Sequence, residues 1–208
     1  MKALTSLLLI AAILCSIYLV GFTKSGINSE AEKEIISKIE YDCNAKSAIL
    51  MEAETGTVLY SKNENEALPP ASVTKIMTLL LVCEALDEGK ISLEDQVSIS
   101  ENASSMGGSQ VYLSPNETMS VEELMKCAII ASANDAAVAL AELVCGSEDA
   151  FVSEMNARAR ELGLNSTTFE NATGLDDTVT NHYTSAYDIA VMSKELIKHE
   201  IITKYSSL

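Results

Sequence analysis

The hydrophobic and polar positions along this chain predict a β-hairpin followed by a cluster of helices. Two apolar runs, 48–51 and 57–60, flank a turn containing Gly56, which predicts an antiparallel hairpin within 47–62. From about Ser72, apolar residues recur at helical spacing as far as Gly89, where the helix should stop. Further helices are expected at about 120–130, 134–145, 148–162 and 185–198.

Helix-start signals and loop residues divide the rest of the chain. Ser92–Asp95 and Ser120–Glu123 both have the residue pattern of a capping box, and Ser185–Asp188 should cap the last helix. Gly and Pro residues predict loops near 106–109 and 114–116. Two strands are too few for a stable sheet of their own, and no partner strands are evident. We therefore predict an α+β fold: an N-terminal β-hairpin and a mostly helical subdomain, without the later strands of a sheet.

The first residues indicate export. Lys2 precedes an uncharged, mostly apolar run over 3–23, which is typical of a signal peptide or an uncleaved membrane anchor. We assign 1–23 to that segment, 24–44 to a linker and 45–208 to a partial catalytic domain. Either form of the segment would place the rest of the chain outside the cytoplasm, at the membrane face or in the cell wall.

Charge and cysteine content exclude some classes of function. The net charge of −16 and the lack of a basic patch disfavour nucleic acid as a partner. Cys83, Cys127 and Cys145 lie in apolar helical stretches, which favours buried thiols, although one disulfide stays possible in an exported protein. No C-x-x-C pair is present, so we expect no metal site.

Ser72-Val73-Thr74-Lys75 is the most specific candidate for catalysis. A serine hydroxyl needs a nearby base, and residues three apart on a helix share one face, so Lys75 can reach the oxygen of Ser72. Lys75 would have to lose its proton, which requires a pKa lowered by burial or by other cations. Unpaired N–H groups at the helix start could help to stabilise an oxyanion. The four-residue pattern alone arises often by chance, but here it follows Pro-Pro-Ala and opens an apolar helix.

Ser132-Ala133-Asn134 is the second candidate. Its hydroxyl could relay a proton and its amide could hold a substrate amide. Ser100-Glu101-Asn102 and Ser114-Pro115-Asn116 match the same S-x-N pattern, but we interpret them as capping and loop residues. Only Ser132 lies between two apolar helices. A polar group is unexpected in such a setting, which favours a functional role for it. The alternative is that Ser132 merely caps the following helix.

Together these two motifs give the chain a specific resemblance. S-x-x-K with S-x-N is the active-site pair of penicillin-binding proteins and serine β-lactamases. From about Ala45 to the last residue, the chain resembles the D-alanyl-D-alanine carboxypeptidase family of low-mass penicillin-binding proteins. The matching stretches are 70–78, 105–110, 130–137 and 181–188.

The resemblance implies a serine-type D-Ala-D-Ala carboxypeptidase that acts through an acyl-enzyme. Ser72 would attack the carbonyl of the penultimate D-Ala in a peptidoglycan stem peptide, and Lys75 would take its proton. Ser132 would pass a proton to the leaving amine, and Asn134 would bind the substrate backbone. β-Lactam antibiotics would acylate Ser72 as covalent inhibitors. The resemblance implies no metal and no organic cofactor. A Ser-His-Asp triad using His182 and Asp188 is a weaker alternative.

The family's third element, K-T-G, is not found in these residues. It should follow residue 200, where it supplies a cation for the substrate carboxylate, and its strand gives the second oxyanion donor. Ala172-Thr173-Gly174 lacks the lysine, and Lys24-Ser25-Gly26 precedes Ser72. Losing one oxyanion donor typically costs about 10²–10³ in rate. We therefore expect a C-terminally truncated chain with little or no carboxypeptidase activity.

Two other functions remain open. Glu161-Leu162-Gly163-Leu164-Asn165 imitates the E-x-x-L-N signature of a class A β-lactamase, although we interpret it as a helix end with Gly163 as its cap. The chain could also be a non-catalytic, membrane-anchored cell-wall binding protein that keeps only the front of the fold.

Overall fold

The computed structural model describes residues 43–175 and 179–207. The predicted signal or anchor segment, 1–23, lies outside these residues, as does the predicted linker up to residue 42. From Asn44 onward the described residues form one compact unit.

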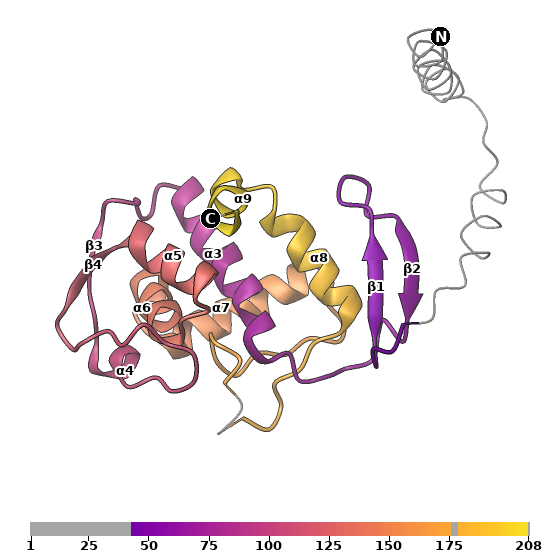
Figure 1. The fold of residues 1–208 in the computed structure, drawn as a ribbon, viewed down its shortest axis with the longest axis horizontal. Helices are drawn as coiled ribbons and strands as arrows, with labels where there is room; N and C mark the ends of the chain where they lie inside the picture. Colours follow the sequence, from indigo (N-terminus) through magenta and orange to yellow (C-terminus); the bar gives the residue numbers. More distant parts are fainter. Residues whose placement is uncertain (1–42, 176–178, 208) are drawn as a thin grey trace, which may run out of the picture. The chain divides into compact units, whose positions relative to one another are not determined.

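The chain first forms the predicted hairpin. Strand β1 (Ala48–Met51) pairs antiparallel with β2 (Val58–Lys62), with a register shift between Leu50 and Met51 (Figure 1). The Glu52 carboxylate closes the turn, because it accepts hydrogen bonds from the backbone N–H groups of Glu54 at 3.0 Å and Thr55 at 2.6 Å. The prediction of this hairpin is confirmed.

Helices make up most of the remainder (Figure 1). A 3₁₀ turn, η1, leads directly into the first long helix, and the predicted helices agree with the observed ones to within about two residues at most ends. The helical elements are η1 (Ala71–Thr74), α3 (Lys75–Asp87), α4 (Glu101–Ser104), α5 (Val121–Ile130), α6 (Asn134–Cys145), α7 (Glu148–Glu161), α8 (Ala186–Leu196) and α9 (Glu200–Ser206).

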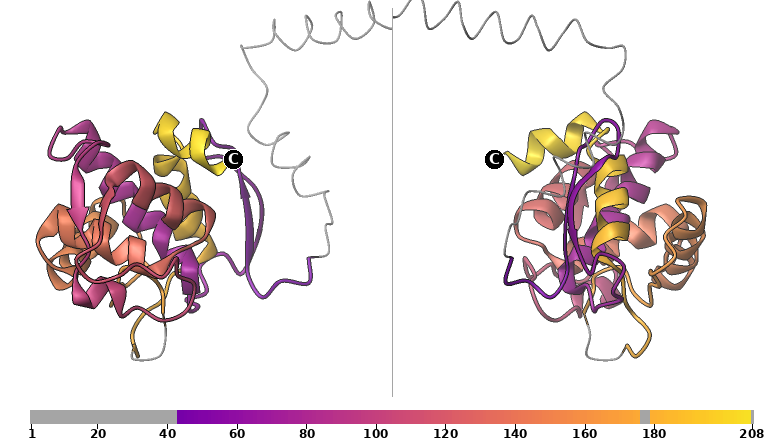
Figure 2. Two further views of the ribbon diagram at one scale, coloured as in Figure 1. Left: turned by 60° about the vertical axis from the view of Figure 1, so that its left-hand side comes forward. Right: turned by 90° about the vertical axis from the view of Figure 1, so that its right-hand side faces the viewer.

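Helix α3 lies at the centre of the helical part. It contacts α6, α7 and α8, and Figures 1 and 2 show it running between these neighbours. Residues Met77 to Cys83 are all buried, so α3 has no polar face in its middle. This enclosure explains the nearly uninterrupted apolar run that comes after Lys75. It also gives the N-terminal end of α3, with Ser72 and Lys75, a rigid support.

Only one of the two predicted capping boxes opens a helix. At Ser120 the box is complete, with Ser120 and Glu123 bonding reciprocally at the start of α5. At Ser92 the Asp95 carboxylate also accepts both the N–H and the hydroxyl of Ser92, each at 2.8 Å. The chain then enters strand β3 (Gln96–Ser98), so this box closes a turn and opens no helix. The same local bonds can close a turn, and only packing decides whether a helix or a strand comes next.

Two further elements differ from expectation. Strand β3 pairs antiparallel with β4 (Thr118–Ser120), which the sequence did not predict. The last predicted helix ends at Leu196 instead of Lys198, and α9 comes after it. Within the described residues the strands form two separate two-stranded sheets, which agrees with the predicted α+β class and its incomplete sheet. None of the described helices is long and apolar enough to span a membrane.

Candidate active site

Ser72 and Lys75 lie together at the start of α3. The Nζ of Lys75 is 3.5 Å from the Oγ of Ser72, as the spacing of three residues predicted. Ser72 is exposed, whereas Lys75 is buried to 4% exposure. Ala71, directly before Ser72, has a φ of +47°, a strained value for a residue with a side chain. The turn thus presents the hydroxyl outward while the amine approaches it from inside.

The environment of Lys75 favours its neutral form. Burial lowers the pKa of Lys75 from 10.5 to about 8. Among the described residues no carboxylate forms an ion pair with it, and its amine instead donates to the carbonyl oxygen of Thr173 at 3.1 Å. The lower pKa raises the neutral fraction at pH 7 roughly 300-fold, to about a tenth of the molecules. Lys75 therefore meets the requirement for a general base.

The segment 171–175 holds the carbonyl that faces Lys75. The Asn171 side chain organises it, because its Oδ1 accepts the N–H groups of Thr173 at 3.1 Å and Gly174 at 2.7 Å. Its Nδ2 donates to the carbonyl of Leu175 at 2.7 Å. The hydroxyl of Thr78, on α3, donates to the carbonyl of Ala172 at 2.6 Å. These bonds fix the segment against the first turns of α3.

Gly174 lies against the turn that carries Ser72. A Cβ at this position would be 1.7 Å from the carbonyl oxygen of Ala71 and 2.7 Å from the Oγ1 of Thr74, and its φ is +81°. Only glycine allows this approach of two backbones. The A-T-G at 172–174, which lacks the lysine of K-T-G, is thus part of the site through its backbone.

The second motif lies at the start of α6. The N-cap of α6 is Ala133, without a side-chain cap, so the alternative that Ser132 caps this helix is wrong. Ser132 has a φ of +53°, an uncommon value that a functional site can impose. Ser100, in contrast, caps α4 by accepting the N–H of Ala103, as interpreted from the sequence. Ser132 therefore stays available for chemistry.

Asn134 is buried, and its amide is only half satisfied. Its Nδ2 donates to the carbonyl of Gly107 at 2.7 Å, and its backbone N–H donates to the carbonyl of Ser109. Its Oδ1 is buried and has no hydrogen-bond partner among the described residues. A buried acceptor without a donor is costly, which favours a donor that arrives with a ligand.

Gly108 brings the two motifs into one region. A Cβ on Gly108 would be 2.8 Å from the Nδ2 of Asn134 and 3.3 Å from the Cδ1 of Leu175. Asn134 and Leu175, at the end of the segment that holds Lys75, therefore both lie next to this glycine. Helices α3 and α6, which carry the motifs, also pack together. In the part of the chain that the structure describes, no hydrogen bond joins Ser132 to Ser72 or Lys75.

His182 and Asp188 do not form a catalytic triad with Ser72. The carboxylate of Asp188 accepts the N–H of Ser166 at 2.8 Å and the hydroxyl of Thr167 at 2.7 Å. The His182 ring bonds to Thr74 and to the backbone of Glu170. No described hydrogen bond links His182 to Asp188 or to Ser72. The triad alternative is therefore wrong.

The E-x-x-L-N stretch also has a structural role. Helix α7 ends at Glu161, and Gly163 comes soon after with a φ of +72°, as predicted for a helix end. The Glu161 side chain is 66% exposed and pairs with Arg158 at 3.0 Å. It is therefore placed as a surface carboxylate and not as a buried base for deacylation.

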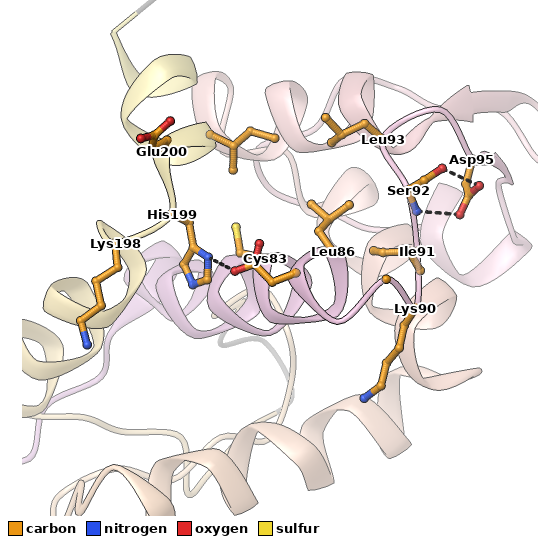
Figure 3. A pocket seen from close by; sticks show the side chains of 13 residues that line it. Cys83, Leu86, Lys90, Ile91, Ser92, Leu93, Asp95, Lys198, His199 and Glu200 are labelled. Atoms are coloured by element: carbon orange, nitrogen blue, oxygen red, sulfur yellow. Dashed lines mark hydrogen bonds and ion pairs between the residues drawn. The ribbon is translucent and has the colours of Figure 1, made fainter.

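A cavity of about 850 Å³ lies elsewhere, between the C-terminal end of α3 and the α8–α9 connection (Figure 3). The His199 Nδ1 pairs there with the Oδ2 of Asp87 at 2.9 Å. Burial raises the pKa of the Cys83 thiol to about 12, so the cavity lacks an activated nucleophile. None of the predicted site residues lines it, and we do not assign the catalytic site to it.

Fold and site together are typical of the penicillin-binding class of proteins, and the comparisons agree. The family model for D-alanyl-D-alanine carboxypeptidase matches residues 31–208. The chain is 52% identical over 198 residues to the D-alanyl-D-alanine carboxypeptidase DacF of Bacillus subtilis, covering 95% of this chain and 50% of that protein. This chain belongs to the D-alanyl-D-alanine carboxypeptidase family.

Solved structures support the same fold. The D-alanyl-D-alanine carboxypeptidase DacD of Francisella tularensis superposes with a TM-score of 0.77 at 35% identity, over 80% of this chain and 40% of that one. The ampicillin-bound penicillin-binding protein D2 of Listeria monocytogenes superposes with a TM-score of 0.65 at 32% identity, over 74% of this chain and 62% of that one. The chain spans about half the length of these curated relatives, 50% of the Bacillus subtilis DacF and 42% of the Escherichia coli DacC.

The sequence did not predict the contribution of residues 170–175 and of His182 to the site. Thr173 acts through a backbone carbonyl and Gly174 through the absence of a side chain, and neither leaves a recognisable residue pattern. The sequence suggested a role for His182 only as a member of a catalytic triad. The resemblance does point to this part of the chain, because the stretch 181–188, which includes His182, matches the family.

Proposed function

We propose that the protein of which these residues form part is a serine-type D-Ala-D-Ala carboxypeptidase. The observation that carries the proposal is the buried amine of Lys75, which has no carboxylate partner among the described residues and lies 3.5 Å from the exposed hydroxyl of Ser72. A buried cation without a counter-charge destabilises a fold, so its presence beside a serine favours a chemical role. Membership of the family supplies the reaction.

The proposed reaction begins with Lys75 as the neutral amine. Ser72 Oγ attacks the carbonyl carbon of the penultimate D-Ala, and its proton passes to the Nζ of Lys75. The C–N bond to the terminal D-Ala then breaks, and the leaving amine takes a proton, which we assign to a relay through Ser132. Water hydrolyses the ester on Ser72 and regenerates the hydroxyl. A β-lactam ring offers the same kind of carbonyl, so penicillin would stop the cycle at the ester.

Asn134 is proposed to bind the substrate backbone. Its buried Oδ1 has no described partner and would accept a hydrogen bond from a substrate amide N–H or from Lys75. Its Nδ2 is held by Gly107, so the orientation of the amide is set before a ligand arrives. A preset acceptor of this kind reduces the ordering cost of binding.

The natural substrate is proposed to be a peptidoglycan stem peptide, met outside the cytoplasm. The names of the relatives support a D-alanyl-D-alanine carboxypeptidase, and the ampicillin-bound relative supports β-lactams as ligands. Residues 1–23 are proposed to direct export, as a cleaved signal or as a membrane anchor. Residues 24–44 and 45–208 are proposed as linker and partial catalytic domain.

Fluorescent penicillin tests the proposal on these 208 residues. We expect labelling to be slow, because the cation and second oxyanion donor of K-T-G are not among these residues. Ser72→Ala should abolish the labelling, because it removes the nucleophile. Mass spectrometry should place the adduct on Ser72. Labelling that persists in Ser72→Ala would contradict the nucleophile, and rapid stoichiometric labelling would contradict the need for K-T-G. Release of D-Ala from a stem pentapeptide should be undetectable or slow.

A further inference from the structure

His182 is a buried residue that the proposed chemistry does not use. It is 7% exposed, and both ring nitrogens have partners. The Nδ1 accepts the backbone N–H of Glu170 at 3.0 Å, and the Nε2 is 2.8 Å from the Oγ1 of Thr74. A backbone N–H can only donate, so Nδ1 carries no proton in this arrangement. The ring is therefore neutral, and its Nε2–H donates to Thr74.

Both partners of His182 lead to Lys75. Thr74 directly precedes Lys75, is 1% exposed and ends the 3₁₀ turn that carries Ser72. Glu170 directly precedes the segment 171–175, whose Thr173 carbonyl accepts a hydrogen bond from the Lys75 amine. The imidazole thus bridges the turn directly before Lys75 and the segment that holds the Lys75 amine.

The surroundings keep the ring in one orientation. The Phe169 ring meets it edge-on, with centroids 5.7 Å apart and planes at 72°. The Glu170 carboxylate accepts the N–H groups of Thr180 and Asn181, at 2.8 and 2.9 Å, just before His182. Burial lowers the pKa of His182. The negative charge of Glu170 raises the same pKa, but by less than burial lowers it. The neutral ring is the form that this setting favours.

We propose, on the basis of the function proposed above, that His182 is a positioning residue for Lys75. Through Thr74 and the Glu170 backbone, it sets the separation between the turn that carries Ser72 and the Thr173 carbonyl. Loss of the bridge would let the amine leave its place beside Ser72 without removing any group that touches the substrate. A misplacement of about 1 Å can cost roughly 100-fold in rate.

Two substitutions at position 182 separate the halves of the bridge. His182→Gln places an amide N–H near the site of Nε2 and can keep the bond to Thr74. His182→Asn is shorter and can keep only the acceptor for Glu170. A second pair of variants tests the same bond from the other side: Thr74→Ser keeps the hydroxyl, and Thr74→Val replaces it with a methyl group of similar size. If a His182 variant does not fold, the Thr74 pair decides.

The first measurement is independent of acylation. Lysine labelled with ¹³C at Cε is titrated by NMR, and the Lys75 signal is assigned by its absence in Lys75→Met. Wild type should titrate near pH 8, where burial places the pKa of Lys75. His182→Asn and Thr74→Val should move the midpoint upward, because a loosened turn admits water to the amine. Thr74→Ser should stay near wild type, whereas His182→Gln keeps only the Thr74 half of the bridge and should move the midpoint upward by less than His182→Asn.

The second measurement is the acylation rate of folded protein by penicillin. We expect a loss of roughly 10- to 100-fold in His182→Asn and Thr74→Val, with little further loss in the double variant. If wild type is not acylated, the proposed function fails for these residues, and the titration still tests the bridge. Unchanged midpoints in folded His182→Asn and Thr74→Val, with lower thermal stability alone, would show that His182 is only a structural residue and overturn the proposal.

Discussion

Lys75 and Thr173 are 98 positions apart in the chain, yet the amine of Lys75 donates to the carbonyl oxygen of Thr173 at 3.1 Å. The contact holds the amine without neutralising it, because a carbonyl accepts a hydrogen bond but carries no full charge. A carboxylate in the same place would favour the protonated amine and raise its pKa. The arrangement thus keeps Lys75 both ordered and ready to lose its proton.

The buried Lys75 should reduce stability at neutral pH. Below about pH 8 the amine is protonated in both folded and unfolded chains, and the folded state bears the full cost of burying the charge. We expect Lys75→Met to raise the free energy of unfolding at pH 7 by roughly 1–3 kcal/mol while abolishing labelling of Ser72 by penicillin. Urea denaturation measures the free energy of unfolding, and labelling with fluorescent penicillin measures the loss of acylation.

The same group sets a pH dependence. Because the folded protein releases the Lys75 proton at lower pH than the unfolded chain does, wild-type stability should gain from this group between about pH 8 and 10.5. Lys75→Met should lose that gain. Lys46→Met, at a side chain that is 75% exposed, should keep it and change stability by about 0.5 kcal/mol or less. Equal pH slopes in wild type and Lys75→Met would rule out the lowered pKa.

Gly174→Ala should disrupt the site because its Cβ would lie 1.7 Å from the carbonyl oxygen of Ala71. We expect a loss of roughly 2–4 kcal/mol in the free energy of unfolding, and impaired acylation of the folded fraction. Gly163→Ala is the matched control, since Gly163 also has a positive φ but its Cβ would meet no atom within 4 Å. It should cost about 1 kcal/mol. Equal losses in the two variants would show that the approach of Gly174 to Ala71 is unimportant.

Asp135 should anchor the loop that Asn134 contacts. It is fully buried, and its carboxylate accepts the N–H groups of Val111 at 3.1 Å and Leu113 at 3.0 Å. Asp135→Asn turns one acceptor into a donor that faces these N–H groups, so we expect a loss of roughly 2–3 kcal/mol. Hydrogen exchange at Val111 and Leu113 should quicken. Asp149→Asn, at an exposed site, should leave both exchange rates unchanged. Unchanged rates in Asp135→Asn would refute the anchoring role.

The cysteines should differ in reactivity. Burial raises the pKa of the Cys83 thiol to about 12, whereas Cys145 is partly exposed and its pKa is raised less. At pH 8, iodoacetamide should modify Cys145 before Cys83, and Cys83 should stay protected until urea unfolds the chain. Peptide mass spectrometry gives the order of modification. Modification of Cys83 in folded protein at the rate of Cys145 would contradict its burial.

Local patterns predicted most of the helices and the hairpin because the features that form them are close in sequence. The apolar run after Lys75 indicated a buried helix, and Gly56 marked the turn between two strands. The pattern did not predict that the turn closed by Ser92 and Asp95 leads into a strand. Strand pairing between residues near 97 and 119 depends on the path of the whole chain, which a local pattern does not contain.

The sequence by itself determined the pair Ser72 and Lys75, since a spacing of three on a helix brings a hydroxyl and an amine together wherever the helix lies. It also determined the family, through four matching stretches spread over the chain. Only the tertiary structure decided how Lys75 is held: burial removes water from its amine, and the Thr173 carbonyl and the His182 bridge come from about a hundred residues away. Desolvation and long-range hydrogen bonds are properties of the packed chain, so no local pattern could have predicted them.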